Sequence, residues 1–158
     1  MLPDAGRSTT TADAVCVERD EAGHRRLVTT ETIPAGEEIL EIEGVRRTAP
    51  TRYSIQIGPH EHLDDMGPVN ATNHACDPSA LVDFSDPERI VLRALRDLAP
   101  GDEISIHYCA TEYDMASPFD CHCGAADCLS SIRGYRWVSG EAARRLEPWL
   151  RPGLRGAS

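Results

Sequence analysis

Short runs of apolar and β-branched residues, each bounded by glycine, proline or acidic residues, recur along most of the chain. Runs of this kind are typical of strands rather than helices. They predict strands at residues 14–18, 25–30, 38–43, 53–57, 81–84, 90–95 and 103–108. We therefore expect a mostly β domain of many short strands, with little helix.

Two regions depart from this pattern. Residues 59–79 are rich in His, Asp, Asn, Gly and Pro, and they predict irregular structure with a helical turn near residues 61–65. Residues 139–150 predict one helix, with Ser139 as its N-cap and apolar residues at helical spacing. Pro148 is unfavourable for the last turn of this helix, because proline has no backbone N–H to donate.

Two segments of similar sequence predict two similar corners. The sequence TIPAGEEIL at residues 32–40 matches DLAPGDEIS at residues 97–105. In each, a glycine permits the positive φ angle of a tight turn, and the acids after it keep the turn in water. The match is too short to mark a repeat architecture.

The length and the apolar content indicate one domain that is not inserted in a membrane. A chain of 158 residues buries a core without disulfides. No apolar run approaches the ~20 residues that a membrane-spanning helix needs, and the first residues lack the apolar core of a secretion signal. We expect a cytoplasmic protein with no membrane partner and a flexible tail at residues 1–13.

The charge pattern restricts the chemistry and the partners. The chain has 26 acidic and 16 basic residues, a net charge of -10, and every basic residue is arginine. The absence of lysine excludes a P-loop, a Schiff base and a lysine general base. The negative charge argues against a nucleic-acid partner and favours a cationic one.

Three of the six cysteines are spaced as metal ligands. Cys121, Cys123 and Cys128 lie within eight residues, in a loop where Gly124 lets the chain fold back. Since nothing points to secretion, a tetrahedral structural Zn²⁺ explains them better than disulfides do. Spacing alone leaves the fourth ligand open; the candidates are Cys76, Cys109, His107 and His122.

Four blocks, in order, resemble a SET domain with its post-SET zinc loop, the fold of protein-lysine methyltransferases. The likeness to short stand-alone members spans about residues 15–134. The blocks are RLVTTETIPAGE at residues 26–37, NHACDP at 73–78, RALRDLAPGDEI at 93–104 followed by Tyr108, and FDCHCGAADC at 119–128. The resemblance implies a SET domain at residues 14–115, a post-SET loop at 116–135, and a C-terminal helix and tail at 136–158.

The resemblance also implies a cofactor and its ligands. In such a fold, residues 73–76 and the strand that ends at Tyr108 meet in a pseudoknot-like crossing, with S-adenosyl-L-methionine bound on one side. Asn73 and His74 are then expected to hold this cofactor. Cys76 is expected to be the fourth ligand of the structural Zn²⁺.

The family assigns Tyr108 to catalysis. Methyl transfer from a sulfonium is an in-line displacement by a neutral amine, so alignment matters more than a strong anion. A neutral tyrosine hydroxyl orients the amine. It does not stabilise the positive charge of the sulfonium, which disappears in the transition state. Tyr53 is a weaker second candidate, for a wall of the acceptor channel.

The sequence departs from the family near the cofactor. The Gly-x-Gly that usually precedes the position of Leu27 is here His24-Arg25-Arg26. The resemblance places Arg26 and Leu27 at the methionine end of the cofactor, where Arg26 is expected either to pair with the cofactor carboxylate or to block it. Ile106 stands where many members carry the aromatic residue that limits methylation, so the number of methyl groups is open.

These observations favour methyl transfer to a lysine amine in a basic protein segment. A second hypothesis keeps the fold but takes a small cationic metabolite, or the cofactor itself, as the substrate, because the short chain lacks an added substrate-recognition domain. A third is a non-catalytic, zinc-stabilised interaction module, motivated by the missing Gly-x-Gly.

Overall fold

Short strands account for most of the regular structure in the computed structural model, which describes residues 14–156. The predicted tail at residues 1–13 lies outside this range. The strands are β1 (Val15–Arg19), β2 (Arg25–Thr29), β3 (Glu38–Glu41), β4 (Val45–Arg47), β5 (Ile55–Gly58), β6 (Glu61–Asp64), β7 (Asn73–His74), β8 (Ala80–Asp86), β9 (Arg89–Ala94), β10 (Glu103–Ile106), β11 (Phe119–Asp120) and β12 (Ser131–Ile132). The mostly β class is confirmed, as are seven predicted strands, with shifted ends.

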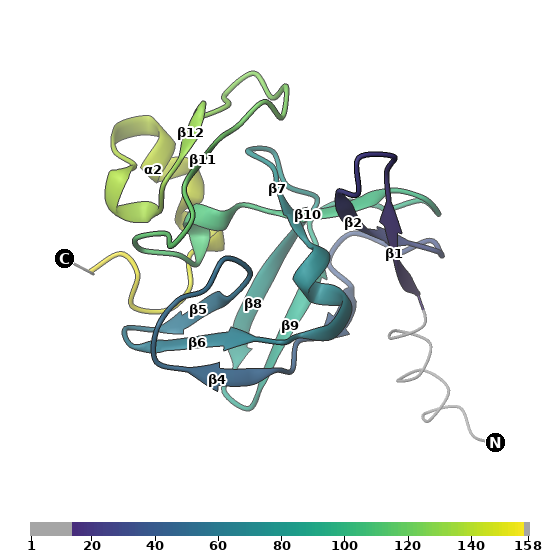
Figure 1. The fold of residues 1–158 in the computed structure, drawn as a ribbon, viewed down its shortest axis with the longest axis horizontal. Helices are drawn as coiled ribbons and strands as arrows, with labels where there is room; N and C mark the ends of the chain where they lie inside the picture. Colours follow the sequence, from purple (N-terminus) through teal and green to yellow (C-terminus); the bar gives the residue numbers. More distant parts are fainter. Residues whose placement is uncertain (1–13, 157–158) are drawn as a thin grey trace.

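The strands form three small sheets and one hairpin (Figure 1). The largest sheet has the order β1-β2-β10-β7, and the other two have the orders β3-β9-β8 and β4-β6-β5. All neighbours are antiparallel except β10 and β7, which run parallel. The hairpin of β11 and β12 lies apart from the sheets. One apolar cluster, shared by the three sheets, holds them together.

The two corners of similar sequence pair with each other. The backbone N–H of Ile33 donates to Leu98 O at 2.9 Å, and the N–H of Leu98 donates to Ile33 O at 2.8 Å. Gly36 and Gly101 both have positive φ angles, 86° and 92°. The resemblance therefore reflects two matched turns that meet across the core, with Ile33 and Leu98 both buried.

The predicted helical turn at residues 61–65 is wrong, because this segment is the middle strand of a sheet. In β6, Leu63 is opposite Arg46 of β4 on one side and Ile55 of β5 on the other. Its sequence is polar and shows no alternation, so only its pairing with β4 and β5 reveals it as a strand.

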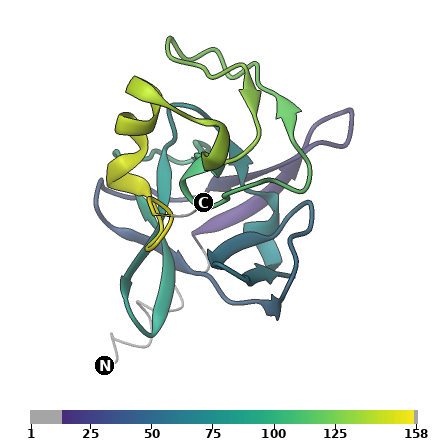
Figure 2. The same ribbon diagram turned by 90° about the vertical axis from the view of Figure 1, so that its left-hand side faces the viewer.

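The C-terminal segment forms a second body of structure beside the sheets. The predicted helix begins after Ser139, as expected, and runs as α2 (Gly140–Leu146) before it narrows to a 3-10 turn at Glu147–Trp149, where Pro148 lies. Figure 2, viewed from this side, shows α2 and the β11–β12 hairpin in front of the sheets. Two further 3-10 turns are Tyr108–Ala110 and Tyr135–Trp137, and a fourth is Gly67–Ala71.

Two apolar clusters hold these parts together. The larger joins the three sheets, and its fully buried members include Leu27, Ile39, Leu92 and Ile104. The smaller joins the C-terminal segment to the end of β10, and the partly buried Tyr108 packs against both clusters. Among residues 14–156, no helix has the length and the apolar composition needed to cross a membrane.

Replacement of Ile104 by alanine tests whether β10 is the centre of the fold. Ile104 is fully buried and lies opposite Leu27 in the central pairing of the largest sheet. We expect Ile104→Ala to lower the free energy of unfolding by about 2–5 kcal/mol, from lost transfer free energy and the cavity that it leaves. Val45→Ala, at an exposed position on β4, is the control and should cost much less. Urea denaturation measures both; equal losses would contradict a core centred on β10.

Candidate functional site

The parallel pairing of β7 with β10 brings residues 72–76 beside Tyr108. Ala75 N–H donates to Ile106 O at 3.0 Å, which extends the ladder beyond the two strands. Tyr108 N–H donates to His74 Nδ1 at 3.1 Å, and the Tyr108 hydroxyl donates to Thr72 O at 2.7 Å. Backbone and side-chain hydrogen bonds therefore fix the phenol at the crossing. The expected meeting of these two segments is confirmed.

An open cleft of about 330 Å³ lies on one side of the crossing. The Asn73 side-chain amide lies in its wall, where it donates to Arg25 O at 2.9 Å and to Glu103 Oε2 at 3.1 Å. The open cleft is lined by Gly23, His24, Arg25, Arg52, Tyr53, Asn70, Ala71 and Asn73. Such a volume suits a ligand of nucleoside size.

A smaller inner cavity, of about 40 Å³, lies next to the open cleft. Arg52, Tyr53 and Asn70 line both spaces and so form the shared wall. The remaining lining residues of the inner cavity are Thr51, Ser54, Ile55, Val69, Thr72, Ile106, Tyr108, Thr111, Glu112, Met115, Ala116 and Ser117. The arrangement suits two ligands that approach a common boundary from opposite sides.

Tyr108, in the inner cavity, and Tyr53, in the shared wall, differ in environment. Burial raises the pKa of Tyr108 well above its ordinary value, so its hydroxyl stays protonated and acts as a donor. Tyr53 is half exposed, and the guanidinium carbons of Arg25 and Arg52 lie 5.4 and 5.7 Å from the centre of its ring. The expected place of Tyr53 in a cavity wall agrees with this geometry.

Of the four residues predicted to bind the cofactor, only Asn73 lines the open cleft. The Arg26 guanidinium pairs with Glu18 at 2.8 Å on the outer face of the β1–β2 hairpin. The Leu27 side chain is fully buried in the larger apolar cluster. Arg25, the first residue of β2, lines the open cleft, whereas its neighbour Arg26 does not. Nothing in the sequence pattern marked Arg52 or Asn70, because they enter the cleft from segments of irregular structure.

His74 faces away from the open cleft. Its Nε2 lies 3.3 Å from Cys76 Sγ, and its ring centre lies 4.6 Å from that of His107. Burial lowers the pKa of His74 to about 3, so the imidazole is neutral and accepts the hydrogen bond from Tyr108. His74 therefore connects the phenol to the cysteine cluster.

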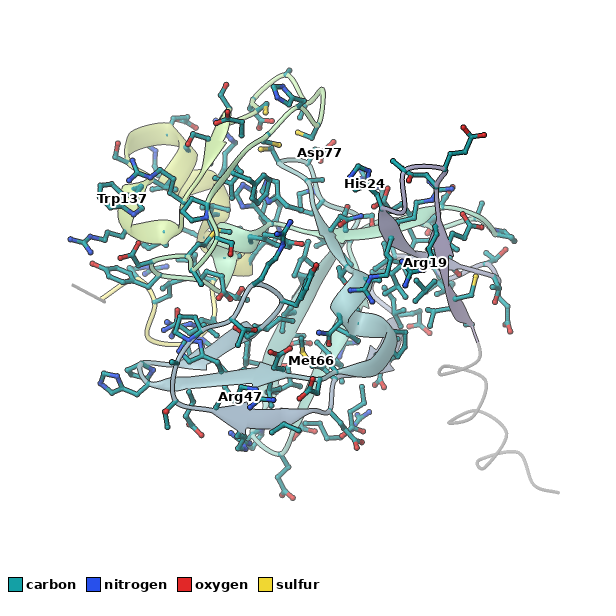
Figure 3. All side chains as sticks on the ribbon, viewed as in Figure 1. Arg19, His24, Arg47, Met66, Asp77 and Trp137 are labelled. Atoms are coloured by element: carbon teal, nitrogen blue, oxygen red, sulfur yellow. The ribbon has the colours of Figure 1, made fainter. Side chains whose placement is uncertain are left out.

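The four predicted metal-binding thiols come together. The sulfur atoms of Cys76, Cys121, Cys123 and Cys128 all lie within 4.8 Å of one another. In Figure 3 the sulfur atoms gather beside Asp77, where the loop after β7 meets the loop between β11 and β12. A tetrahedral zinc with sulfur ligands at 2.3 Å separates them by about 3.8 Å, so the donor set fits this ion.

Local hydrogen bonds shape this donor set. Leu129 N–H donates to Cys76 Sγ at 3.3 Å, and such a bond stabilises a metal-bound thiolate. Cys121 N–H donates to Ser130 O at 2.7 Å, which closes the loop that carries three of the thiols. Among residues 14–156, the alternative ligands Cys109, His107 and His122 are not part of this group of four, and His107 instead forms a separate group with His74 and Cys76. Four sulfur ligands leave no open position, so the ion would be structural.

The sequence is similar to a known domain family and to known methyltransferases. The profile of the SET domain matches residues 24–109. Methyltransferase flvH of Aspergillus flavus is 36% identical over 121 residues, which cover 76% of this chain and 66% of that protein. Histone-lysine N-methyltransferase set9 of Schizosaccharomyces pombe is 29% identical over 123 residues, covering 70% of this chain and 27% of that protein. The chain thus spans about two thirds of the first relative and a smaller part of the second.

A solved structure agrees with the fold. A crystal structure of KRYPTONITE with mCHH DNA, an H3(1-15) peptide and SAH has a TM-score of 0.58 and 26% sequence identity, covering 75% of this chain and 29% of that chain. Another, with mCHG DNA and SAH, has a TM-score of 0.59 and 27% identity, covering 75% of this chain and 28% of that chain. Because both are complexes with DNA, they do not support the expectation that nucleic acid is absent from the partners.

Substitution of single cysteines tests the metal centre. We expect the purified protein to hold about one zinc per chain, and Cys76→Ser to lose most of it, because three thiols bind zinc far more weakly than four. Chelation should then loosen the C-terminal segment while the sheets stay folded. Cys16→Ser, at an exposed position on β1, is the matched control and should keep the zinc. Elemental analysis and hydrogen exchange measure both effects; a zinc content unchanged in Cys76→Ser would contradict the assignment.

Proposed function

Because this chain belongs to the SET domain family, we propose that it transfers a methyl group from S-adenosylmethionine to the side-chain amine of a lysine in a basic protein segment. The observation that carries the proposal is the pair of spaces that share one wall, with the Tyr108 hydroxyl in the lining of the inner cavity. A donor in the open cleft and an acceptor in the inner cavity would meet at the shared wall. Catalysis of a displacement depends chiefly on such alignment.

The residues of the open cleft suit the donor. S-adenosylmethionine supplies an electrophilic methyl group on a sulfonium, and SAH, present in the two KRYPTONITE structures, is the molecule that remains after this methyl leaves. Arg25 and Arg52 provide guanidinium groups for its carboxylate. Asn73 offers a side-chain amide, and the Tyr53 ring offers an aromatic surface at the boundary of the two spaces.

The residues of the inner cavity suit the end of a lysine side chain. Ile55, Val69 and Ile106 provide apolar walls for the methylene stem. The buried Thr72 hydroxyl has no hydrogen-bond partner among residues 14–156, and an amine in this cavity would supply one. The neutral Tyr108 hydroxyl would orient the amine. Because it carries no negative charge, it would not stabilise the positive sulfonium of the ground state, whose charge is lost in the transition state.

The charge of the chain supports a basic partner. The net charge of -10 attracts a positively charged segment over a long range. The matching relatives named as histone-lysine N-methyltransferases and the H3(1-15) peptide of one KRYPTONITE complex point in the same direction.

Incubation with labelled S-adenosylmethionine and an H3(1–15) peptide tests the reaction. We expect label on lysine, located by mass spectrometry of the peptide. Tyr108→Phe removes the hydroxyl that orients the amine and should lower kcat by about 10²-fold or more, with the affinity for SAH unchanged. Tyr135→Phe is the matched control, since the Tyr135 side chain does not line the inner cavity and its hydroxyl has no hydrogen bond among residues 14–156.

Two outcomes would contradict the proposal in different ways. Calorimetry that detects no SAH binding to the zinc-loaded protein would favour an interaction module over an enzyme. Label on free lysine or butylamine, but on no peptide or basic protein, would keep the donor and reject the protein acceptor.

A further inference from the structure

A buried carboxyl group, that of Glu112, lines the inner cavity together with Tyr108. Glu112 is only 8% exposed and lies in the wall of the cavity with Tyr108 and Thr72. Its Oε2 accepts hydrogen bonds from Gln56 N–H and from the Thr111 hydroxyl, each at 2.7 Å. Its Oε1 accepts none from the described part of the chain.

The backbone fixes Glu112 relative to the phenol. Glu112 N–H donates to Tyr108 O at 2.9 Å, within the turn that follows β10. On the other side, Tyr135 N–H donates to Glu112 O at 2.8 Å. The carboxyl group and the phenol therefore project from one rigid turn into the same cavity. A side chain fixed in this way is pre-organised for a ligand.

The charged and titratable groups around Glu112 come from several elements. Arg151, buried after the last 3-10 turn, uses Nε and Nη1 on the backbone oxygens of Thr111 and Pro152 and forms no ion pair within residues 14–156. Tyr108 and Cys109 lie in the 3-10 turn that precedes Glu112, and Arg52 lines the cavity. Burial and the nearby charge of Arg151 lower the pKa of His62, on β6. Burial raises the pKa of Glu112 to about 7, although its two hydrogen bonds and Arg151 favour the anion.

We propose that Glu112 binds the ammonium group of the acceptor through Oε1 and takes one of its protons before methyl transfer; this inference deepens the function proposed above and rests on it. In this step one N–H bond of the ammonium breaks and an O–H bond forms on the carboxylate. The products are a neutral amine and a neutral carboxylic acid. The ligand class is a primary alkylammonium ion, and the Thr72 hydroxyl offers the amine a second hydrogen bond.

The chemistry of the reaction favours such a group. An alkylammonium has a pKa of about 10.4, so almost none of it is the neutral nucleophile at neutral pH. A carboxylate in a desolvated cavity attracts the cation and then accepts its proton. Once protonated, the carboxyl group is uncharged, so it does not hold back a sulfonium that is losing its positive charge.

Proton counting by calorimetry tests the inference. Butylamine, the end of a lysine side chain, is titrated into the SAH-saturated full chain in buffers of different ionisation enthalpy. If Glu112 and the amine share one proton, binding at pH 6 releases about one proton, because free Glu112 is protonated there, and binding at pH 8.5 releases almost none. Glu112→Gln should abolish this pH dependence, whereas Glu112→Asp should restore part of it. The control Glu141→Gln, at an exposed position on α2, should match the wild type.

Several results would overturn the inference. A proton release that is independent of pH in the wild-type protein would do so even if Glu112→Gln fails to fold. So would the same pH dependence in Glu112→Gln as in the wild type, or a failure of butylamine to bind at all. Failure of the proposed function shows separately, as an absence of SAH binding, and the butylamine titration is then carried out without SAH.

Kinetics give a second readout once an acceptor peptide is labelled. At pH 7.5 we expect Glu112→Gln to lower kcat/KM by about 10²–10⁴-fold. The difference in kcat/KM between Glu112→Gln and the wild type should shrink as the pH approaches the pKa of the amine, because the neutral amine then forms without a base in the cavity. A merely structural role would lower the rate by the same factor at every pH and would contradict the assignment.

Discussion

The parallel pairing of β7 with β10 is the constraint on which the rest of the structure depends. β10 has β2 on one side and β7 on the other, so a strand of two residues is placed beside the centre of the largest sheet. Parallel neighbours need a long connection, and here the 28 residues at positions 75–102 connect β7 to β10. This pairing puts Thr72 O within reach of the Tyr108 hydroxyl, in the lining of the inner cavity.

The cysteine cluster secures the same crossing from outside. The C-terminal segment shares no sheet with the main body, and it is joined to it through the smaller apolar cluster and through Cys76. His74 carries this connection inward, since it contacts both the Cys76 sulfur and the Tyr108 backbone. A structural ion at the four thiols would therefore support the position of Tyr108 although it lies outside both cavities.

The inner cavity contains polar groups that packing alone does not explain. The buried Thr72 hydroxyl has no hydrogen-bond partner among residues 14–156, which lowers stability relative to an apolar residue of the same size. The Glu112 carboxyl group is also buried there, and burial disfavours its charged form. If the proposed function is right, an acceptor with N–H donors offsets both losses when it enters the cavity.

The sequence by itself determined the mostly β class, the seven strands with a clear apolar pattern, the two matched corners and the three clustered thiols, because each depends on neighbours a few residues apart. It predicted a helical turn where β6 lies, and it did not mark Glu112 or Arg52, which line the cavities. Of the residues that it assigned to the cofactor, Arg26 and Leu27 do not line the open cleft. Only the tertiary structure decided these points. A strand with a polar sequence is defined by its partners, and the walls of a cavity come from segments that meet only when the chain has folded.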